Sequence, residues 1–402
     1  MSGPGVPGDP RRTARPAAPV RQRMWDGGSA WVVTRHHDVA AVLTDPRFVT
    51  NTASLPGGGP DSHADLLVKV GVSADLAPYL AGNLTHVDAP EHTRLRRLVS
   101  EAFTAERVAA LRPRVAALAG TLLDALPGHA TDGTVDLVEH FARPLPIAVL
   151  CELLGIPERD RPRWRGWSRD CAGTSPRTLN TALGELAAAV RELAGRRRTD
   201  PRDDLLTGLV QTRDESGGRL DDAELVTMVL TLLVAGHETT AHLIANGTAA
   251  LLAHPEQLAL LRADPGLIPG AVQELLRLYG PPTATQPRYA TEDIAVGGVD
   301  IPRGDCVHAQ LAAANRDPAH YPRPDALDIT RAPRTPHLAY SLGPHRCLGA
   351  GLADQQAETA LAALFGRFPG LTLAVPPERF SWQPSPVMLH LTRLPVRLGR
   401  TA

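Results

Sequence analysis

The stretch Tyr340-Ser341-Leu342-Gly343-Pro344-His345-Arg346-Cys347-Leu348-Gly349 is the most informative part of this sequence. It places one cysteine beside a histidine and an arginine, between glycines and just before residues 350–367, which have the pattern of a helix. Cationic neighbours and the positive end of a helix both lower the pKa of a thiol, so the loop favours a thiolate. Such a thiolate serves as a nucleophile, a zinc ligand or the axial ligand of a haem iron. The loop alone leaves these alternatives open.

The composition predicts a cytoplasmic protein that binds neither nucleic acid nor membrane. The 402 residues are 43% hydrophobic, enough for a large core in one or two domains. A net charge of -1 gives no overall attraction to nucleic acid or anionic lipid. The four cysteines lack paired spacing, which suits a reducing compartment.

The pattern along the chain predicts a mainly α fold with small β-sheets. Residues 1–23, rich in Gly, Pro and Arg, are expected to be a disordered segment before a single domain over residues 24–402. No apolar run is expected to reach membrane-spanning length, and residues 225–235 are interpreted as part of a buried core helix. Helices are predicted at residues 38–45, 92–103, 105–126, 144–154, 179–198, 221–253, 255–263 and 270–279. Short strands are predicted at residues 31–33, 294–299, 307–311 and 388–398.

The helix over residues 221–253 carries Gly236, Glu238 and Thr239 inside an apolar run. A glycine within a helix costs about 1 kcal/mol relative to alanine, and an unpaired buried acid costs more. We therefore expect a kinked or widened turn against which a ligand packs, with Glu238 and Thr239 relaying protons through water. The alternative is a polar patch that faces solvent.

Other polar residues suggest a structural ion pair and an anion site. Glu274 and Arg277 lie three residues apart on one helical face, and we expect them to form a buried ion pair. His92 and Arg96 also share a helical face. Together with Arg288 and His345 they are four donors that could converge on two carboxylates of one cofactor.

Taken together, these segments resemble the cytochrome P450 family of haem-thiolate monooxygenases. The resemblance extends from about residue 31 to the end of the chain. The overall sequence pattern is similar to that of the soluble bacterial members of the family, especially actinobacterial enzymes that tailor natural products. The motifs that carry it, in order, are residues 88–97, 235–240, Glu274 with Arg277, 288–290, 315–318 and 340–349. The family fold implied is a triangular helical prism with small sheets, and with haem buried between the long helix and the cysteine loop.

The resemblance also implies a role for each residue. Cys347 would bind the iron of haem b (iron protoporphyrin IX), Glu238 and Thr239 would deliver protons, and four residues would bind the propionates, namely His92, Arg96, Arg288 and His345. The implied pocket residues are Tyr79, Leu84, Leu233, Val234, Ala235, Thr283, Ala284, Val387 and Met388. Tyr340 and Ser341 depart from the Phe and Gly that the family usually has.

The implied reaction is O2-dependent hydroxylation or epoxidation of a hydrophobic secondary metabolite, such as a macrolide, polyketide or cyclic peptide. Electrons would come from a ferredoxin and its reductase, which we expect to dock on the face presenting Arg94 and Arg97 of a monomer. Oxidative coupling or rearrangement without oxygen insertion is an alternative within the same fold. A haem-based sensor is an alternative of another class, and a cysteine hydrolase is the third.

Overall fold

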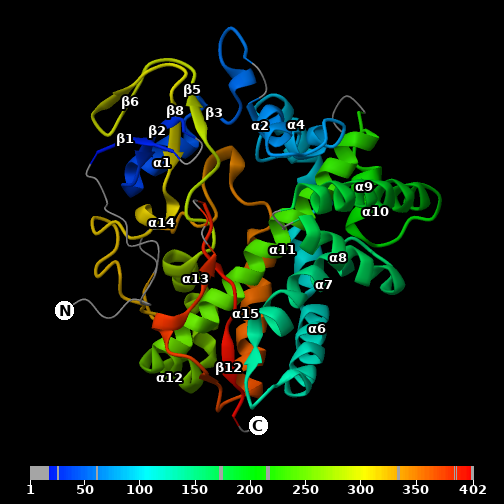
Figure 1. Cartoon of the computed structure of the whole chain (residues 1–402), viewed down its shortest axis with the longest axis vertical. Helices are drawn as coiled ribbons and strands as arrows, with labels where there is room; N and C mark the ends of the chain where they lie inside the picture. The colour runs from blue at the N-terminus through cyan, green and yellow to red at the C-terminus, as the bar shows by residue number, and fades with distance from the viewer. Residues whose placement is uncertain are drawn as a thin grey trace. The chain divides into compact units, whose positions relative to one another are not determined.

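The computed structural model describes residues 18–24, 27–59, 62–171, 175–213, 218–332, 336–383, 385 and 387–399. The expectation of a mainly α fold with small β-sheets is confirmed (Figure 1). The helices are α1 His36–Thr44, α2 Ser62–Lys69, α3 Ala77–Ala81, α4 Glu91–Ala102, α5 Ala105–Ala110, α6 Arg112–Ala125, α7 Pro144–Leu153, α8 Arg161–Cys171, α9 Pro176–Thr199, α10 Leu205–Gln211, α11 Asp222–Ala253, α12 Pro255–Ala263, α13 Ile268–Tyr279, α14 Leu311–Ala314 and α15 Ala350–Arg367. The strands are β1 Val20–Arg23, β2 Ser29–Val33, β3 Phe48–Val49, β4 Val135–Asp136, β5 Arg288–Ala290, β6 Ile294–Val296, β7 Val299–Ile301, β8 Cys306–Ala309, β9 Thr372–Leu373, β10 Trp382–Gln383, β11 His390–Leu391 and β12 Pro395–Arg397.

The chain forms two compact units. Unit 1 comprises Met1–Phe48, Arg112–Leu145 and Thr239–Ala402, and unit 2 comprises Val49–Leu111 and Pro146–Glu238. The helix α11 begins in unit 2 and continues in unit 1 from Thr239. The single domain over residues 24–402 stays a prediction.

Unit 1 contains the sheet that supports the cysteine loop. Its strands run in the order β1, β2, β8 and β5, with β2 and β8 parallel and the other two pairs antiparallel. Figure 1 shows α1 alongside this sheet. A buried apolar cluster joins sheet and helix, and Leu338 belongs to it while Leu342 packs against it. Because these two leucines flank the start of the cysteine loop, the cluster positions that loop.

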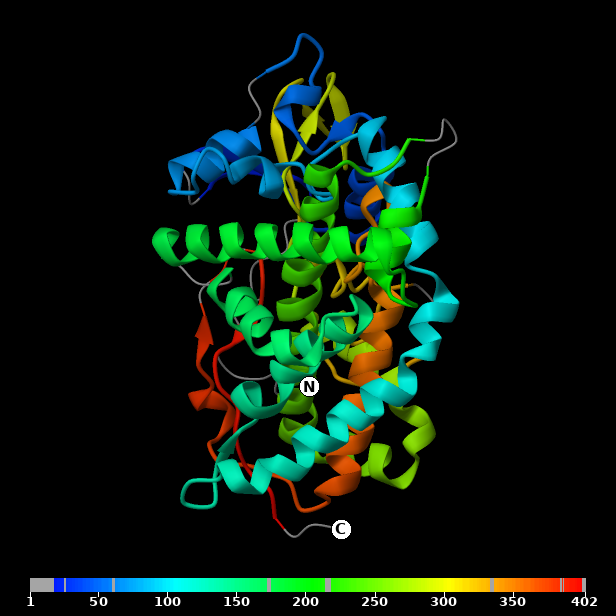
Figure 2. The same ribbon diagram turned by 90° about the vertical axis from the view of Figure 1, so that its right-hand side faces the viewer.

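Two helix pairs complete the support for the cysteine loop in unit 1. The helix α15, which follows the loop directly, packs against α6 and against α13. The first pair is visible in Figure 2 as the orange and cyan helices. The loop is thus held by the apolar cluster on one side and by α15 on the other.

Unit 2 is almost entirely helical. The long helix α9 packs against α8 and α10, and α10 packs against α4 (Figure 2). A buried ion pair joins the end of α9 to the start of α10, where Arg197 Nε donates to Asp204 Oδ2 at 2.6 Å. Arg197 also donates to the Gly155 carbonyl, and Asp204 caps α10 by accepting the Thr207 N–H.

Several element boundaries differ from those expected. Residues 105–126 form two helices rather than one, because Pro113 has no N–H with which to continue the hydrogen-bond ladder of the first helix. Residues 20–23, assigned to a disordered segment, form β1 and pair with β2. Residues 1–17 of that segment lie outside the described residues. The helices α2 and α8 were not expected, because their polar residues obscure the apolar period.

The expectation that no apolar run reaches spanning length is wrong for α11. This helix is long and apolar enough to cross a membrane by length and composition. However, 61% of its apolar window is buried inside the protein, as in the core helix of a globular protein.

We predict that the Arg197–Asp204 pair stabilises the fold. Asp204→Asn leaves the Arg197 charge buried without its counter-ion, so the free energy of unfolding should fall by about 3 kcal/mol. Urea unfolding followed by circular dichroism measures the change. Asp222→Asn is the matched control, since Asp222 pairs with Arg198 at the surface and should cost less than about 1 kcal/mol. Equal losses in both variants would contradict the prediction.

Candidate functional site

The cysteine loop presents Cys347 at the protein surface. The Cys347 side chain is exposed, and its backbone N–H donates to the Tyr340 carbonyl at 2.8 Å. The Arg346 N–H donates to the Gly343 carbonyl at 3.1 Å. Gly349 is the N-cap of α15, so the positive end of an 18-residue helix begins three residues after the thiol. The loop therefore closes on itself and leaves the sulfur accessible.

Two loop residues have left-handed backbone. Gly343 has φ +69°, and a Cβ placed there would lie 2.4 Å from the Leu43 carbonyl oxygen, so only glycine fits. Ser341 has φ 59°, a region that costs a side chain of L configuration about 1–2 kcal/mol. The serine thus adopts the conformation that a glycine would adopt without strain.

The polar segment of α11 lies within one continuous helix. Residues 222–253 are continuous α-helix, and Leu150 of α7 lies 3.4 Å from the position of a Gly236 Cβ. The expected kinked turn therefore stays a prediction, and Gly236 lies beside a leucine of α7. Val234, in the middle of this core helix, is 42% exposed, whereas Leu233 is fully buried.

A buried hydrogen bond fixes the residue that precedes Glu238. Ser168 Oγ of α8 lies 2.8 Å from His237 Nδ1, and both side chains are buried. His237 Nδ1 lies 3.8 Å from Glu238 Oε1. The acid is therefore held beside an imidazole whose ring is anchored to α8, an arrangement that no sequence spacing indicated.

The four candidate anion-binding residues divide between the two units. Unit 1 holds Arg288 on β5, which is 4% exposed, and His345 in the cysteine loop. Unit 2 holds His92 and Arg96 on α4, and His92 is 3% exposed. A buried arginine and a buried histidine are costly unless they face an anion or polar groups.

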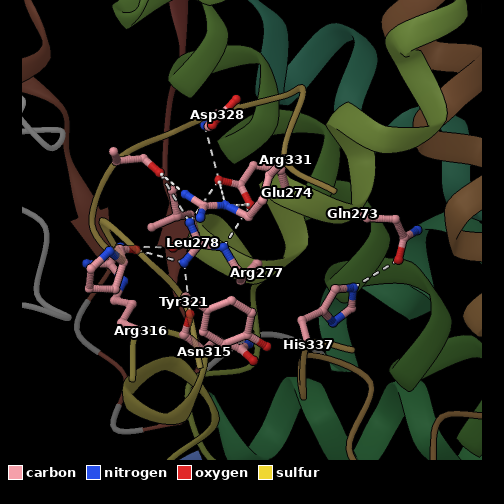
Figure 3. Close-up of polar contacts among 12 residues, drawn as sticks. Gln273, Glu274, Arg277, Leu278, Asn315, Arg316, Tyr321, Asp328, Arg331 and His337 are labelled. Atoms are coloured by element: carbon pink, nitrogen blue, oxygen red, sulfur yellow. Dashed lines mark hydrogen bonds and ion pairs between the residues drawn. The ribbon is translucent and has the colours of Figure 1, made fainter. Parts of the chain in front are cut away.

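Glu274 and Arg277 form a buried ion pair in which Arg277 Nε lies 2.7 Å from Glu274 Oε2 (Figure 3). A second arginine, Arg331, donates to both Glu274 oxygens at 3.1 Å. The Asp328 N–H also donates to Glu274. Arg331 was missed by sequence analysis because nothing local marks it among the many arginines of the chain.

A model of the family described as cytochrome P450 matches residues 178–264 and 266–392. The 6-deoxyerythronolide B hydroxylase of Saccharopolyspora erythraea is 41% identical over 387 residues, covering 96% of this chain and 94% of the relative. The vitamin D(3) 25-hydroxylase of Pseudonocardia autotrophica is 41% identical, covering 95% and 91%. Among solved structures, the bacillaene polyketide synthase P450 PksS of Bacillus subtilis has a TM-score of 0.84 at 35% identity, covering 95% of this chain and 94% of that one.

The chain belongs to the cytochrome P450 family. It is a P450 monooxygenase whose cofactor is haem, and P450s of this type use redox partners and O2 to oxidise hydrophobic substrates. The residues described above fit such a group. They supply one exposed thiol for the iron and four cationic or N–H-donating side chains for carboxylates. Val234 adds exposed apolar surface on the core helix.

In unit 1 the structure brings two segments with expected pocket residues of this P450 together. In unit 1 the Thr283 N–H donates to the Val387 carbonyl at 2.9 Å, and Pro282 bridges Met388, so the two segments run side by side. In unit 2 Tyr79 receives a hydrogen bond from Arg191 of α9. The remaining pocket residues differ in burial: Leu84, Leu233 and Ala284 are buried, while Ala235 is exposed.

The C-terminal segment of the P450 is tied to α11 in unit 1. Asn246 donates to the carbonyls of Tyr279 and Leu389, each at 3.2 Å. The rings of His242 and His390 stack with centroids 4.5 Å apart. Both contacts lie within two turns of Thr239, so they tie this part of α11 to the segment that contains Met388.

We predict that His337, ten residues before Cys347, makes the P450 acid-sensitive. Burial, aided by the charges of Arg277 and Arg346, lowers the pKa of His337 to about 4. The unfolded chain therefore binds this proton first, and stability should fall as pH drops from about 6.5 to 4, by up to about 1.4 kcal/mol per pH unit.

His337→Gln, which keeps an N–H donor but does not titrate, should flatten this part of the stability curve. Urea midpoints at pH 7.0, 6.0 and 5.0 test it. His254→Gln is the control, since that imidazole is only half-buried on another helix end. Parallel curves for wild type and His337→Gln would contradict the prediction.

Proposed function

We propose that this P450 hydroxylates or epoxidises a bulky hydrophobic secondary metabolite, such as a macrolide, polyketide or cyclic peptide. The observation that carries the proposal is the exposed Cys347 in a closed, glycine-containing loop at the N-terminus of α15. The relatives named for hydroxylation of 6-deoxyerythronolide B and vitamin D(3) support a large, apolar substrate.

Cys347 would hold the iron, and its thiolate would be stabilised by the helix terminus and by the neighbouring Arg346. Arg288 and His345 from unit 1 and His92 and Arg96 from unit 2 would hold the two propionates. Their positive or N–H-donating groups, of which those of His92 and Arg288 are buried, would match the carboxylates. When bound, the haem supplies the activation of dioxygen and its transfer to substrate.

Glu238 and Thr239 would move protons on α11. The carboxylate is partly exposed, which gives it access to water, and the neighbouring His237 is immobilised by Ser168. The Thr239 hydroxyl, next in the chain, would pass the proton towards the reacting centre. Both groups are half-buried, so the route excludes most bulk solvent.

The substrate would contact mainly small and apolar side chains. Val234 and Ala235 are exposed on α11, and Val387 and Met388 are half-buried. Leu84, Leu233 and Ala284 are buried, so they would offer the substrate less surface than these residues. Apolar walls with few polar groups favour a large hydrophobic substrate.

The electron donors would be a ferredoxin and its reductase. The P450 would be a monomer with a single domain, and it would act in the cytoplasm. A basic face on α4 supports this choice. Arg94 pairs with Glu91 and Glu224, and Arg97 lies three residues further along α4; we assign both arginines to the docking face.

The test of the cysteine assignment is the spectrum of the reduced protein with carbon monoxide. The haem-loaded wild type should show the far-shifted Soret band of thiolate ligation. Cys347→Ser should lose that band, whereas Cys306→Ser, the control, should keep it, since Cys306 lies on β8. A far-shifted band that survives Cys347→Ser would refute the proposed ligand.

The substrate class is tested by titrating the oxidised protein with a 14-membered macrolactone and following the spin-state shift. For a compound that binds and is oxidised, product mass should rise by one oxygen; a loss of two hydrogens would favour coupling.

Thr239→Ala should lower the product formed per O2 consumed by about tenfold or more, because proton delivery contributes about 10²–10⁴-fold. Thr248→Ala, two turns along α11 and fully buried, is the matched control.

A further inference from the structure

Tyr340 holds the cysteine loop by both its side chain and its backbone. Its hydroxyl donates to Asp354 Oδ1 of α15 at 2.7 Å. Its carbonyl accepts the N–H of Cys347 at 2.8 Å. Because a carboxylate oxygen only accepts, the Tyr340 hydroxyl is the donor of this bond. One side chain therefore connects α15 to the backbone of the cysteine itself.

Asp354 has a second partner, Gln273, which is linked through His337 to the residues just before the cysteine loop. His337 Nδ1 accepts the Ala339 N–H at 3.2 Å, so in the neutral ring the hydrogen is on Nε2. That nitrogen lies 3.0 Å from Gln273 Oε1 and donates to it (Figure 3). The Gln273 amide N–H is then directed to Asp354, which it hydrogen-bonds. The hydrogen bonds from Tyr340 and from Gln273 therefore both end at the Asp354 carboxylate.

We propose that these four residues, Gln273, His337, Tyr340 and Asp354, form a clasp that positions Cys347 for iron ligation. The proposal rests on Cys347 being the ligand. The Asp354 clasp holds residues 337–340 against α13 and α15. The Tyr340 carbonyl is thereby kept where it accepts the Cys347 N–H, and this fixes the direction in which the sulfur points. The phenylalanine common at this position of the family could not donate to Asp354, so the clasp is a property of this chain.

The clasp is tested on the haem-loaded protein by the lifetime of thiolate ligation. The reduced carbon monoxide complex is incubated at constant temperature, and conversion of the far-shifted Soret band to the unshifted band is timed. Tyr340→Phe keeps the ring and removes the donor, so conversion should be about fivefold to tenfold faster, the effect expected of one buried hydrogen bond. Glu358→Gln, one turn further on α15 and paired with Arg112, should match the wild type.

A second variant separates positioning from general stability. Gln273→Leu removes the middle of the clasp and should accelerate conversion to a similar extent. The double variant should be no faster than either single variant, because both changes release the same carboxylate. Thermal unfolding midpoints, measured in parallel, should not follow the order of the conversion rates.

Three results would overturn the clasp: a wild-type conversion rate in Tyr340→Phe, equal acceleration by Glu358→Gln, or additive effects in the double variant. Absence of the far-shifted band from the wild type would instead refute Cys347 as the ligand. The two failures are therefore distinguishable.

Discussion

The ion cluster around Glu274 is the interaction on which the surroundings of the cysteine loop depend. One carboxylate that is 4% exposed accepts hydrogen bonds from two guanidinium groups and from a backbone amide. A buried charge is tolerated only when it is paired and its hydrogen bonds are satisfied. Arg277 meets this demand by also donating to the carbonyls of Asn315, Pro324 and Ala326. Irregular chain between residues 315 and 331 is thereby fixed to α13.

The same cluster reaches the cysteine loop through short, identifiable steps. The Asn315 side chain accepts the Leu338 N–H at 2.6 Å, two residues before the loop begins. The charge of Arg277 helps to keep His337 neutral, and neutral His337 directs the Gln273 amide towards Asp354. The loop is thus connected to α13 by hydrogen bonds, and to the sheet by the apolar contacts of Leu338 and Leu342. A reactive thiol in an irregular loop requires this degree of support, since the loop has little regular hydrogen bonding of its own.

The helix α11 is a largely buried core helix and also carries Glu238 and Thr239. Most of its apolar window is buried, which stabilises a long helix. In its middle, Gly236 admits Leu150, Val234 is exposed, and His237 is bonded to Ser168. The acid and alcohol therefore lie on one continuous helix, which would keep a proton donor in place through a reaction cycle.

The sequence by itself determined the chemistry and the order of the parts. Local patterns can be recognised without knowledge of the fold. They include the cysteine between glycines, the Glu274–Arg277 spacing and the helical periods. Most long helices were predicted within a few residues, except where Pro113 divides one and where polar residues conceal α2 and α8. Only the tertiary structure decided the contacts between distant segments. Arg331 reaches Glu274 from 57 residues away, Ser168 reaches His237 from 69, and Asp354 meets Tyr340 from the far side of the loop. Such partners are selected by burial, because a polar group removed from water must find whichever donor or acceptor the fold brings near, and no spacing in the sequence records which one that is.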